Sequence, residues 1–339
     1  MPQFEIKELN LGLNQVLMDL AIWNIAEDSR NGPVLRFPEP TTIKYTDPCR
    51  RLLTNPVRDA NPFFHLFETM WMFAGMNQIE PLLLFNPNMM QYSDDSKVLR
   101  GTAYGHRWRR EWGDQLLEVV RQLTENPSSR QIVMSMWNPT DLFLKNSKDF
   151  ACNLQVLFST RPTENEILGR RILDMTVTNR SNDIVYGALG SNVFHFSMLL
   201  EYVAFHSGLL VGNYYQIANN LHLYTENEVS RRCYSAREEL PRLSPSADHS
   251  LTEFGLSLDK EYIRNYVLTH DTESLTKGDY LHAVVNPLVR AYKCFKNTEV
   301  DAVDRIMSAQ EMAEYCNSKP LRINCIEWLD RRLARRLGK

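Results

Sequence analysis

The sequence predicts an α+β fold: a layered sheet with helices packed beside it, followed by a helical C-terminal extension. Apolar stretches long enough for buried helices occur at 63–73 and 193–205. Short strand-like segments fill the middle of the chain, at 132–137, 154–158, 172–177 and 213–224. Amphipathic helical patterns end the chain. Strands and buried helices mixed in this way form packed layers, which gives the fold class.

The N-terminal part begins with an amphipathic helix expected at 11–26, because its leucines and valine recur on one stripe. Turn residues at 28–33 end this helix. Residues 38–48 are expected to be extended chain or loop. The aromatic helix 63–73 stops at Ala74-Gly75, a typical helix end.

Two features of this part leave alternatives open. Glu68 lies within the apolar helix, where it either faces solvent, pairs with a base or is buried at a cost in free energy. Residues 86–100 are polar and loop-like. The segment Tyr104-Gly-His-Arg-Trp-Arg-Arg that follows is either a solvated basic face with a tryptophan anchor or a platform for an anion or a ring.

A further helix is expected at 114–124, ahead of the strands. A polar, hairpin-like insertion at 160–170 joins two of the strands. Residues 226–271 are charged and are expected to form a surface excursion. Three helices are expected after it, at 279–295, 298–315 and 325–337.

The last two helices carry local signals. Thr298 and Asp301 are spaced like a weak capping box. Four arginines between Arg331 and Arg336 line one side of the final helix, in last turns where cations suit the helix dipole. Such a tail is typical of a packing helix with a solvated face, and contact with nucleic acid is the alternative.

Composition narrows the function classes. The 339 residues are 43% hydrophobic and 23% charged, with a net charge of −3, so no overall basic field favours nucleic acid. The six cysteines include no CxxC pair and no Cys/His zinc spacing, so no metal site is expected. The chain starts without an apolar signal segment, and no stretch approaches the roughly 20 apolar residues of a membrane span. Free thiols in a reducing cytoplasm are therefore expected.

The chemistry gathers between residues 148 and 224. Cys152 comes first, followed by Arg180 with small polar neighbours, then the amide of Asn192, then His222 and Tyr224. His222 and Tyr224 are two apart, so on a strand they share one face. Together these groups are suited to attacking an electron-poor ring while a phosphorylated sugar is held.

These residues, with others upstream, resemble the thymidylate synthase superfamily. The apolar helix with Glu68 resembles the family's helix bearing a catalytic Glu, and Tyr104-Gly-His-Arg-Trp-Arg resembles its Tyr-Gly-x-x-Trp-Arg segment. Further matches follow in order: Ser129-Arg130, Trp137-Asn138-Pro139, Cys152 with Gln155, Arg180-Ser181-Asn182-Asp183, Gly187, Asn192 and His222-x-Tyr224. The resemblance implies a catalytic domain at 1–225 and a variable, mainly helical region at 226–339.

The resemblance implies folate-dependent one-carbon transfer to C5 of a pyrimidine nucleoside monophosphate, with 5,10-methylenetetrahydrofolate as co-substrate. C5 is a poor nucleophile, so a thiolate first adds to C6 and makes the ring enolate-like. By resemblance Cys152 is that thiolate and Arg180 favours its charged form. Glu68 would organise water and proton transfers near the base, and Tyr104 belongs with these catalytic groups.

The resemblance also assigns the binding residues. Arg30, Arg130 and Ser181, beside Arg180, would bind the phosphate. His222 and Tyr224 would bind the sugar. Asp183 and Tyr92 would bind the folate. In the family the arginines of a Ser-Arg-Arg motif reach across a two-fold axis. A homodimer is therefore implied, with Arg130 acting in the partner's site.

The resemblance assigns base choice to Asn192, because an amide offers a donor and an acceptor that suit O4 and N3–H of uracil. Superfamily members that act on cytosine nucleotides tend to use Asp there, so Asn192 favours dUMP over dCMP. The span from Gly187 to Asn192 is longer than usual by one residue. A loop that placed Ser191 at the base would weaken the assignment.

Four departures separate the chain from a typical thymidylate synthase. Gln131 replaces the second arginine of Ser-Arg-Arg, Asn153 stands where His usually follows the nucleophile, and Asn220 replaces an aspartate. The chain ends Arg-Arg-Leu-Gly-Lys, not in a short apolar segment that folds over the folate. If water is admitted, it adds to the exocyclic methylene and gives hydroxymethyl in place of methyl. These departures favour 5-hydroxymethylation of (d)UMP, in the host cytoplasm if the chain is viral.

The sequence leaves other functions open. A thymidylate synthase with an unusual C-terminus would oxidise the folate during turnover, and a dCMP hydroxymethylase would read another base. A non-catalytic nucleotide-binding module would not need Cys152. A nucleic-acid binder that uses the face Arg331–Arg336 would lose affinity steeply with salt.

Overall fold

In the computed structural model, residues 2–163, 169–239 and 250–338 are described. The chain divides into two compact units. Unit 1 comprises Met1–Ala60, Asp114–Leu142 and Ala151–Ser246, and unit 2 comprises Asn61–Gly113, Phe143–Phe150 and Ala247–Lys339. The chain thus passes between the units several times. The division expected at residue 225 concerns the extent of the catalytic part and stays a prediction.

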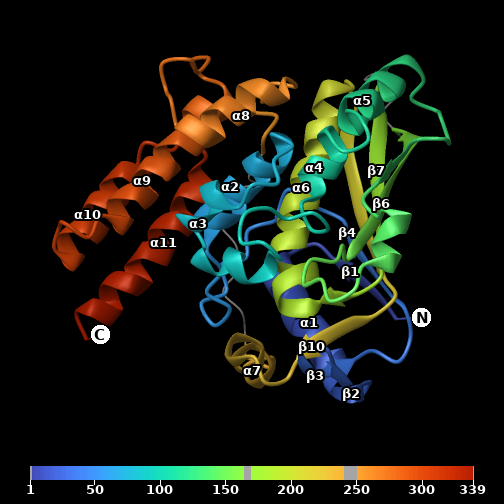
Figure 1. Cartoon of the computed structure of the whole chain (residues 1–339), viewed down its shortest axis with the longest axis horizontal. Coiled ribbons are helices and arrows are strands. Elements are labelled where there is room, and N and C mark those ends of the chain that lie inside the picture. The colour runs from blue at the N-terminus through green and yellow to red at the C-terminus, as the bar shows by residue number, and fades with distance from the viewer. Residues whose placement is uncertain (1, 164–168, 240–249, 339) are drawn as a thin grey trace. The chain divides into compact units, whose positions relative to one another are not determined.

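Unit 1 is built on a six-stranded mixed sheet (Figure 1). Its strands, in spatial order, are β1 (Gln3–Ile6), β4 (Thr41–Tyr45), β9 (Leu210–Ala218), β7 (Arg171–Asn179), β6 (Asn153–Pro162) and β5 (Val133–Ser135). β1 is parallel to β4 and β7 to β9, whereas the other neighbours are antiparallel. β7 and most of β9 alternate buried and half-exposed residues, so one face of the sheet turns to the core.

Helix α6 (Asn192–His206) packs on β7 and β9, and every residue from Val193 to Ala204 is buried. The long buried helix predicted at 193–205 is confirmed. Its one carboxylate, Glu201, pairs with Arg51 Nη2 at 2.5 Å, with side chains 1% and 0% exposed. A charge buried this deeply is tolerated because it is paired.

A smaller sheet and further helical elements are also described in unit 1. Its strands, in spatial order, are β2 (Ile25–Ser29), β3 (Gly32–Arg36), β10 (Leu221–Tyr224) and β8 (Asn182–Asp183). The helical elements are α1 (Leu9–Ile22), α5 (Gln115–Glu125), α7 (Glu228–Ser235) and the π-helical turn Ile184–Ser191. β8 follows directly after β7, and β10 directly after β9. Residues at the ends of the long strands are thereby carried into the small sheet.

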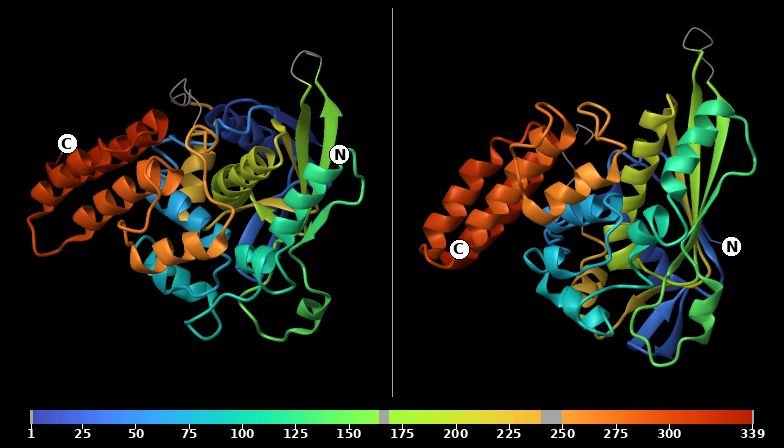
Figure 2. Two further views of the ribbon diagram at one scale, coloured as in Figure 1. Left: turned by 90° about the horizontal axis from the view of Figure 1, so that it is seen from above. Right: turned by 45° about the horizontal axis from the view of Figure 1, so that its top comes forward.

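Unit 2 is helical. Its elements are α2 (Pro62–Phe73), α3 (Glu80–Leu83), the 3₁₀ helix Pro87–Tyr92, α4 (Tyr104–Arg109), α8 (Lys260–Thr269), the π-helical turn Leu281–Val285, α9 (Asn286–Lys296), α10 (Ala302–Ala313) and α11 (Lys319–Arg336). A 3₁₀ turn, Pro139–Phe143, lies where the chain passes from unit 1 to unit 2. Figure 2 shows α9, α10 and α11 side by side in both views.

The C-terminal helices share an aromatic core with α2. Phe63 packs against Tyr292 and Trp328, with ring centroids 5.2 and 5.6 Å apart. Of the four arginines in the last turns, Arg332 stacks on the Trp328 ring at 3.4 Å and donates to Trp328 O at 3.0 Å. Arg335 and Arg336 are exposed. The predicted packing helix with a solvated face is what the structure has.

The α+β class is confirmed, and some element boundaries are corrected. The first helix ends at Ile22, not at residue 26, because the β-branched Ile25 already starts strand β2. Residues 226–271 are more than a surface excursion, since α7 and α8 lie there and α8 buries Ile263, Tyr266 and Val267. The predicted insertion 160–170 includes 164–168, which lie outside the described residues.

Two corrections concern the C-terminal helices. Asp301 is itself the N-cap residue of α10, where its carboxylate accepts a hydrogen bond from Val303 N, so the expected capping box with Thr298 is wrong. α11 begins at Lys319, well before Cys325, because Pro320 suits a first helical turn. No helix in the described ranges is long and apolar enough to cross a membrane.

Candidate active site

Cys152 lies half-buried where the chain enters β6. Three contacts hold it against the residue that follows β7. Arg180 N donates to Cys152 O at 2.9 Å, Arg180 Nε donates to Ala151 O at 2.8 Å, and Arg180 Nη2 lies 3.7 Å from Cys152 Sγ. Antiparallel pairing of β6 with β7 brings the two residues together. A guanidinium at this distance favours a thiolate.

The other thiols are chemically different. All six cysteines are free, as the sequence predicts. Burial raises the pKa of Cys49 and of Cys233 to about 11, and that of Cys316 to about 12. Burial also raises the pKa of Cys325 far above its usual range. These four stay protonated at neutral pH, so their thiols are poor nucleophiles.

A buried amide pair lies next to Cys152. Asn153 and Asn179 are 0% and 2% exposed, and Asn179 Nδ2 donates to Asn153 Oδ1. The two residues are partners across β6 and β7, at a point where the register shifts before Gln155. The sequence identified Asn153 only as a departure. The structure shows a neutral, buried pair beside the thiol, in which neither side chain can exchange a proton at neutral pH.

His222 and Asp183 face each other in the β8–β10 ladder. His222 Nδ1 lies 3.0 Å from Asn220 Oδ1 and 3.5 Å from Ser181 Oγ. Burial lowers the pKa of His222, and burial raises the pKa of Asp183. The imidazole is therefore set up as a neutral hydrogen-bonding group. Asp183 Oδ1 accepts from Tyr186 N at 2.5 Å, whereas Asp183 Oδ2 accepts no hydrogen bond from any described residue.

Tyr224 and Arg30 belong to the same cluster. The ring of Tyr224 meets that of His222 edge-on, with centroids 5.0 Å apart, so the two share a face as predicted. Burial raises the pKa of Tyr224, while a hydrogen bond with Asn31 opposes that rise. The charges of Cys152 and Arg30 also act on Tyr224. Arg30, in the turn of the β2–β3 hairpin, therefore lies within electrostatic range of the thiol-bearing cluster.

Asn192 opens α6, and its Nδ2 donates to Asn182 Oδ1 at 3.1 Å. The extra residue in this loop is taken up by the π-helical turn, whose backbone is non-helical at Leu189 and Gly190. Asn192 is thus bonded to β8, and its choice over Ser191 as the residue that reads the base stays a prediction. Asn182 belongs to the motif Arg180-Ser181-Asn182-Asp183, but the sequence predicts no role for it.

The turn 184–191 is held by residues that the sequence did not identify. Arg58 is 8% exposed, its Nε donates to Val185 O at 3.0 Å, and its guanidinium lies over the Tyr186 ring at 4.5 Å. Tyr45 Oη donates to Ala188 O at 2.6 Å. Arg58 lies in an irregular segment before α2, where no periodicity or motif distinguishes a buried arginine from an exposed one.

Arg130 is not part of this cluster. It is exposed in the turn between α5 and β5. Among the described residues it forms no hydrogen bond or ion pair, in contrast to Arg180. The structure therefore brings together eight predicted residues of unit 1, and leaves Arg130 apart. Those eight are Cys152, Arg180, Ser181, Asp183, Asn192, His222, Tyr224 and Arg30.

Glu68, Tyr104 and Tyr92 belong to unit 2. Glu68 is the single residue of α2 that is not buried, so a half-buried carboxylate projects from an otherwise buried helix. Tyr104 opens α4 and is 9% exposed. Tyr92 ends a 3₁₀ helix and is 48% exposed.

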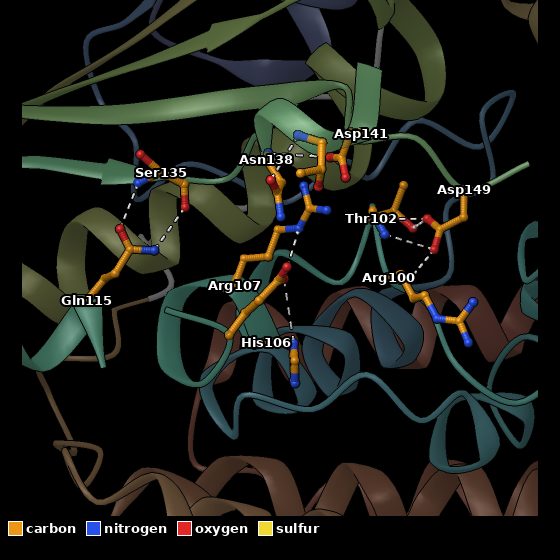
Figure 3. Close-up of polar contacts among 12 residues, drawn as sticks. Arg100, Thr102, His106, Arg107, Gln115, Ser135, Asn138, Asp141 and Asp149 are labelled. Carbon is orange, nitrogen blue, oxygen red and sulfur yellow. Dashed lines mark hydrogen bonds and ion pairs between the residues drawn. The ribbon is translucent and has the colours of Figure 1, made fainter. Parts of the chain in front are cut away.

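The basic cluster that starts at Tyr104 is not the solvated face that one alternative described. Arg107 and Arg109 are 2% and 1% exposed. Arg107 Nε donates to Glu111 Oε2 at 3.2 Å, and Figure 3 shows this arginine beside His106. Arg109 donates to Phe73 O at 3.3 Å and to Leu258 O at 2.8 Å. The Arg109 guanidinium thus joins two segments of unit 2 by donating to their backbone carbonyls.

A buried carboxylate fixes the loop that leads into α4 (Figure 3). Asp149 is 3% exposed and accepts hydrogen bonds from Arg100 N, from Gly101 N at 3.0 Å, and from Thr102 N and Oγ1 at 2.7 and 2.6 Å. Several donors to one carboxylate make a strong, directional anchor. Asp149 therefore fixes the backbone just before Tyr104.

Comparison with known proteins decides the family. The sequence profile described as thymidylate synthase matches residues 57–273. A deoxyuridylate hydroxymethyltransferase of Pseudomonas phage M6 is 36% identical, over 98% of this chain and 95% of that protein. The chain belongs to the thymidylate synthase family. A deoxyuridylate hydroxymethyltransferase of Bacillus phage SP01 is 30% identical, over 81% of this chain and 78% of that protein.

Thymidylate synthases themselves cover less of the chain. That of Streptococcus mutans is 30% identical over 52% of this chain and 60% of its own length. The crystal structure of thymidylate synthase from T4 phage aligns with a TM-score of 0.54 and 20% identity, over 75% of this chain and 91% of that one, which supports the shared fold. Members of the thymidylate synthase family transfer one-carbon groups, so this chain is an enzyme of that class. Within the described ranges, no group of three His, Cys, Asp or Glu could hold a metal ion.

Proposed function

We propose that this enzyme transfers a one-carbon unit from methylenetetrahydrofolate to C5 of deoxyuridine monophosphate and releases the 5-hydroxymethyl nucleotide. The observation that carries this proposal is the extent of the matches. Two phage deoxyuridylate hydroxymethyltransferases match 98% and 81% of the chain, whereas the S. mutans thymidylate synthase matches 52%. All predicted site residues fall in 1–225, which we propose as the catalytic part, with 226–339 as a variable, mainly helical region.

Cys152 begins the reaction. Its thiolate attacks C6 of uracil, a C–S bond forms, and the electron pair of the C5–C6 double bond moves towards O4 to give an enolate-like ring. Arg180, 3.7 Å from the sulfur, favours the thiolate before attack. C5 then attacks the one-carbon unit of the folate. Loss of the C5 proton and of tetrahydrofolate leaves an exocyclic methylene, and the C6–S bond breaks after water has added. Glu68 and Tyr104 serve the proton transfers at the base in this proposal.

The nucleotide is held by the remaining groups of unit 1. Arg30, Arg180 and Ser181 bind the phosphate through charge and hydrogen bonds. His222 and Tyr224, stacked edge to face on β10, bond the sugar hydroxyl. A neutral His222 suits this role, because each ring nitrogen can make one directional hydrogen bond without an added charge. Asn192 reads the base.

The residues of unit 1 fit the folate through Asp183. Its Oδ2 is an acceptor with no hydrogen-bond donor among the described residues, which suits the N–H groups of a pterin. Tyr92, half of whose side chain is exposed, is the second folate contact in this proposal. The folate supplies the one-carbon unit, and the chain supplies its placement.

A homodimer would complete the phosphate site. On β7 and β9, Thr176, Thr178, Tyr215 and Ile217 alternate with buried residues and are half-exposed. We propose that this face meets a second copy and that the exposed Arg130 reaches the partner's phosphate. The enzyme would act in the cytoplasm, that of the host if the chain is viral.

The choice between hydroxymethyl and methyl depends on water. Thymidylate synthases exclude water so that hydride from the folate reduces the exocyclic methylene. Here α9, α10 and α11 lie beyond the family profile, which ends at residue 273. In this proposal water adds to the methylene, which forms the C–O bond and leaves tetrahydrofolate unoxidised.

Product analysis tests this proposal. The protein is incubated with methylenetetrahydrofolate and, separately, with dUMP or dCMP, and the nucleotide is examined by mass spectrometry. The expected result is 5-hydroxymethyl-dUMP with no dihydrofolate. A methyl product together with dihydrofolate would show a thymidylate synthase, and a hydroxymethyl product from dCMP alone would show that the base is misassigned.

A further inference from the structure

We infer that Asn182 is a specificity-determining residue, which positions the amide of Asn192 so that it accepts uracil and rejects cytosine. This rests on the proposed function in one respect, namely that Asn192 contacts the base. Asn182 itself is a positioning residue. It acts on the nucleotide only through Asn192.

The geometry joins the two amides directly. Asn192 Nδ2 donates to Asn182 Oδ1 at 3.1 Å. Asn182 is 3% exposed and is fixed in β8 by its backbone, where Asn182 N donates to Asn220 O at 2.8 Å. Asn192 is half-buried at the first position of α6, so its outer edge remains accessible. One edge of the Asn192 amide is therefore fixed by a hydrogen bond to a buried residue.

This single hydrogen bond determines which donor and acceptor atoms of the Asn192 amide remain available to a ligand. With one N–H of Nδ2 directed to Asn182, Asn192 retains one N–H and its Oδ1. Uracil presents an acceptor at O4 and a donor at N3–H, which match this pair. Cytosine presents a donor at N4 and an acceptor at N3, which match only the flipped amide. The orientation of the Asn192 amide thus determines whether uracil or cytosine is bound.

Asn182 could not impose that choice if its own amide rotated freely. Gly187 prevents this. A Cβ built on Gly187 would lie 2.0 Å from Asn182 Oδ1 and 3.3 Å from Asn192 Nδ2, so its Cα–H lies against that oxygen. A Cα–H group interacts favourably with a carbonyl oxygen and unfavourably with an NH2 group in its place. Asn182 Nδ2, on the other side, has no hydrogen-bond acceptor among the described residues.

Reversing Asn192 alone would place two carbonyl oxygens against each other, which leaves buried acceptors without donors. Reversing both amides would turn the NH2 group of Asn182 towards Gly187 and lose the Cα–H contact. Asn182 Oδ1, Gly187 and Asn192 therefore act together. They fix the Asn192 amide in the orientation whose donor and acceptor match those of uracil.

The test measures discrimination between bases rather than activity alone. Dissociation constants of dUMP and dCMP are measured by equilibrium dialysis without folate, and release of tritium from C5 of each nucleotide is measured in parallel. For Asn182→Ala, we expect the ratio of the two dissociation constants to fall at least tenfold, mainly through weaker dUMP binding. Asn182→Asp keeps an acceptor but has no N–H group, so it should retain most of the wild-type ratio.

Asn10→Ala is the matched control. Asn10 is also fully buried in unit 1, where its Oδ1 accepts from Thr54 N and Asn55 N at 3.0 Å, and it is not a site residue. It should lower the melting temperature and leave the base ratio unchanged. If Asn182→Ala does not fold, Asn182→Ser serves, since its hydroxyl is too short to reach Asn192.

An unchanged base ratio in the folded Asn182→Ala or Asn182→Ser variant overturns the inference, as does loss of the ratio in Asn182→Asp. Failure of the proposed function looks different. A wild-type protein that prefers dUMP but forms no hydroxymethyl product contradicts the proposed reaction and leaves the role of Asn182 to be judged by the ratio. A wild-type protein that binds neither nucleotide overturns both.

Discussion

The thiol of unit 1 and the carboxylate of unit 2 are held by different kinds of force. Cys152 is fixed by backbone and guanidinium hydrogen bonds at the junction of two strands. Glu68 projects from a helix that is held by apolar and aromatic packing, including Phe63 against Trp328. Hydrogen bonds are directional and packing is not. The position of Cys152 is therefore tightly fixed, whereas the surroundings of Glu68 depend on how the C-terminal helices pack.

The largest expected effect breaks the unit 1 side. Cys152→Ser replaces the thiolate by a hydroxyl that is almost never ionised at neutral pH, so turnover should fall by a factor on the order of 10⁴ or more. Binding of dUMP should change by less than about threefold, because serine fills nearly the same space. Equilibrium dialysis and C5 tritium release measure the two. Retained turnover would show that Cys152 is not the nucleophile, and a wild-type protein that binds dUMP without any turnover would support the binding module.

A second prediction compares ion pairs by depth. Arg51→Ala leaves Glu201 charged and buried beneath the sheet, so the free energy of unfolding should fall by about 3–5 kcal/mol. Arg121→Ala removes an exposed arginine that pairs with Glu118 and Glu125, so the free energy of unfolding should change far less. Urea titrations of both variants give the difference. Equal losses would mean that burial does not set the strength of these pairs.

A third prediction sharpens the unit 2 side. Trp328→Ala removes a tryptophan that is 4% exposed and touches Phe63, so stability should fall by about 3 kcal/mol. Because Phe63 lies on the helix that bears Glu68, turnover should fall more than dUMP affinity does. Trp23→Ala is the control, since Trp23 is 68% exposed and should cost little. If dUMP affinity fell as much as turnover, the substitution would be disturbing nucleotide binding as a whole and not the position of Glu68 alone.

The sequence predicts the directional side of this comparison better than the packed side. Motif order places Cys152, Arg180 and His222 in one cluster, because their chemistry and strand periodicity are visible residue by residue. Arg58 and the Arg51–Glu201 pair are invisible to such reasoning. Their burial follows from long-range packing of an irregular segment on α6 and on the turn 184–191. Asn182 lies within a family motif, but its proposed role depends on a contact with Gly187 that only the fold creates.

The smallest predicted effect concerns a histidine beneath α2. His270 ends α8 in a left-handed conformation (φ 52°), and its ring packs on Phe67 with centroids 5.6 Å apart. Burial, with a smaller effect of Lys293, lowers the pKa of His270 to about 4. In the unfolded chain the pKa is about 6.5. Between these values the unfolded state binds a proton that the folded state does not, so stability is full above pH 6.5 and is lost as pH falls towards 4.

The shift corresponds to roughly 3 kcal/mol at most, and about 1 kcal/mol after allowance for a partly solvated ring. His270→Asn keeps a residue that tolerates the left-handed conformation and removes the titration, so the slope of stability against pH between 4 and 6.5 should flatten. His282→Asn, at an exposed histidine of the same unit, should keep the wild-type slope. Urea titrations at several pH values measure all three proteins. If His270→Asn keeps that slope, another group causes the loss of stability in acid, and the burial of His270 does not account for it.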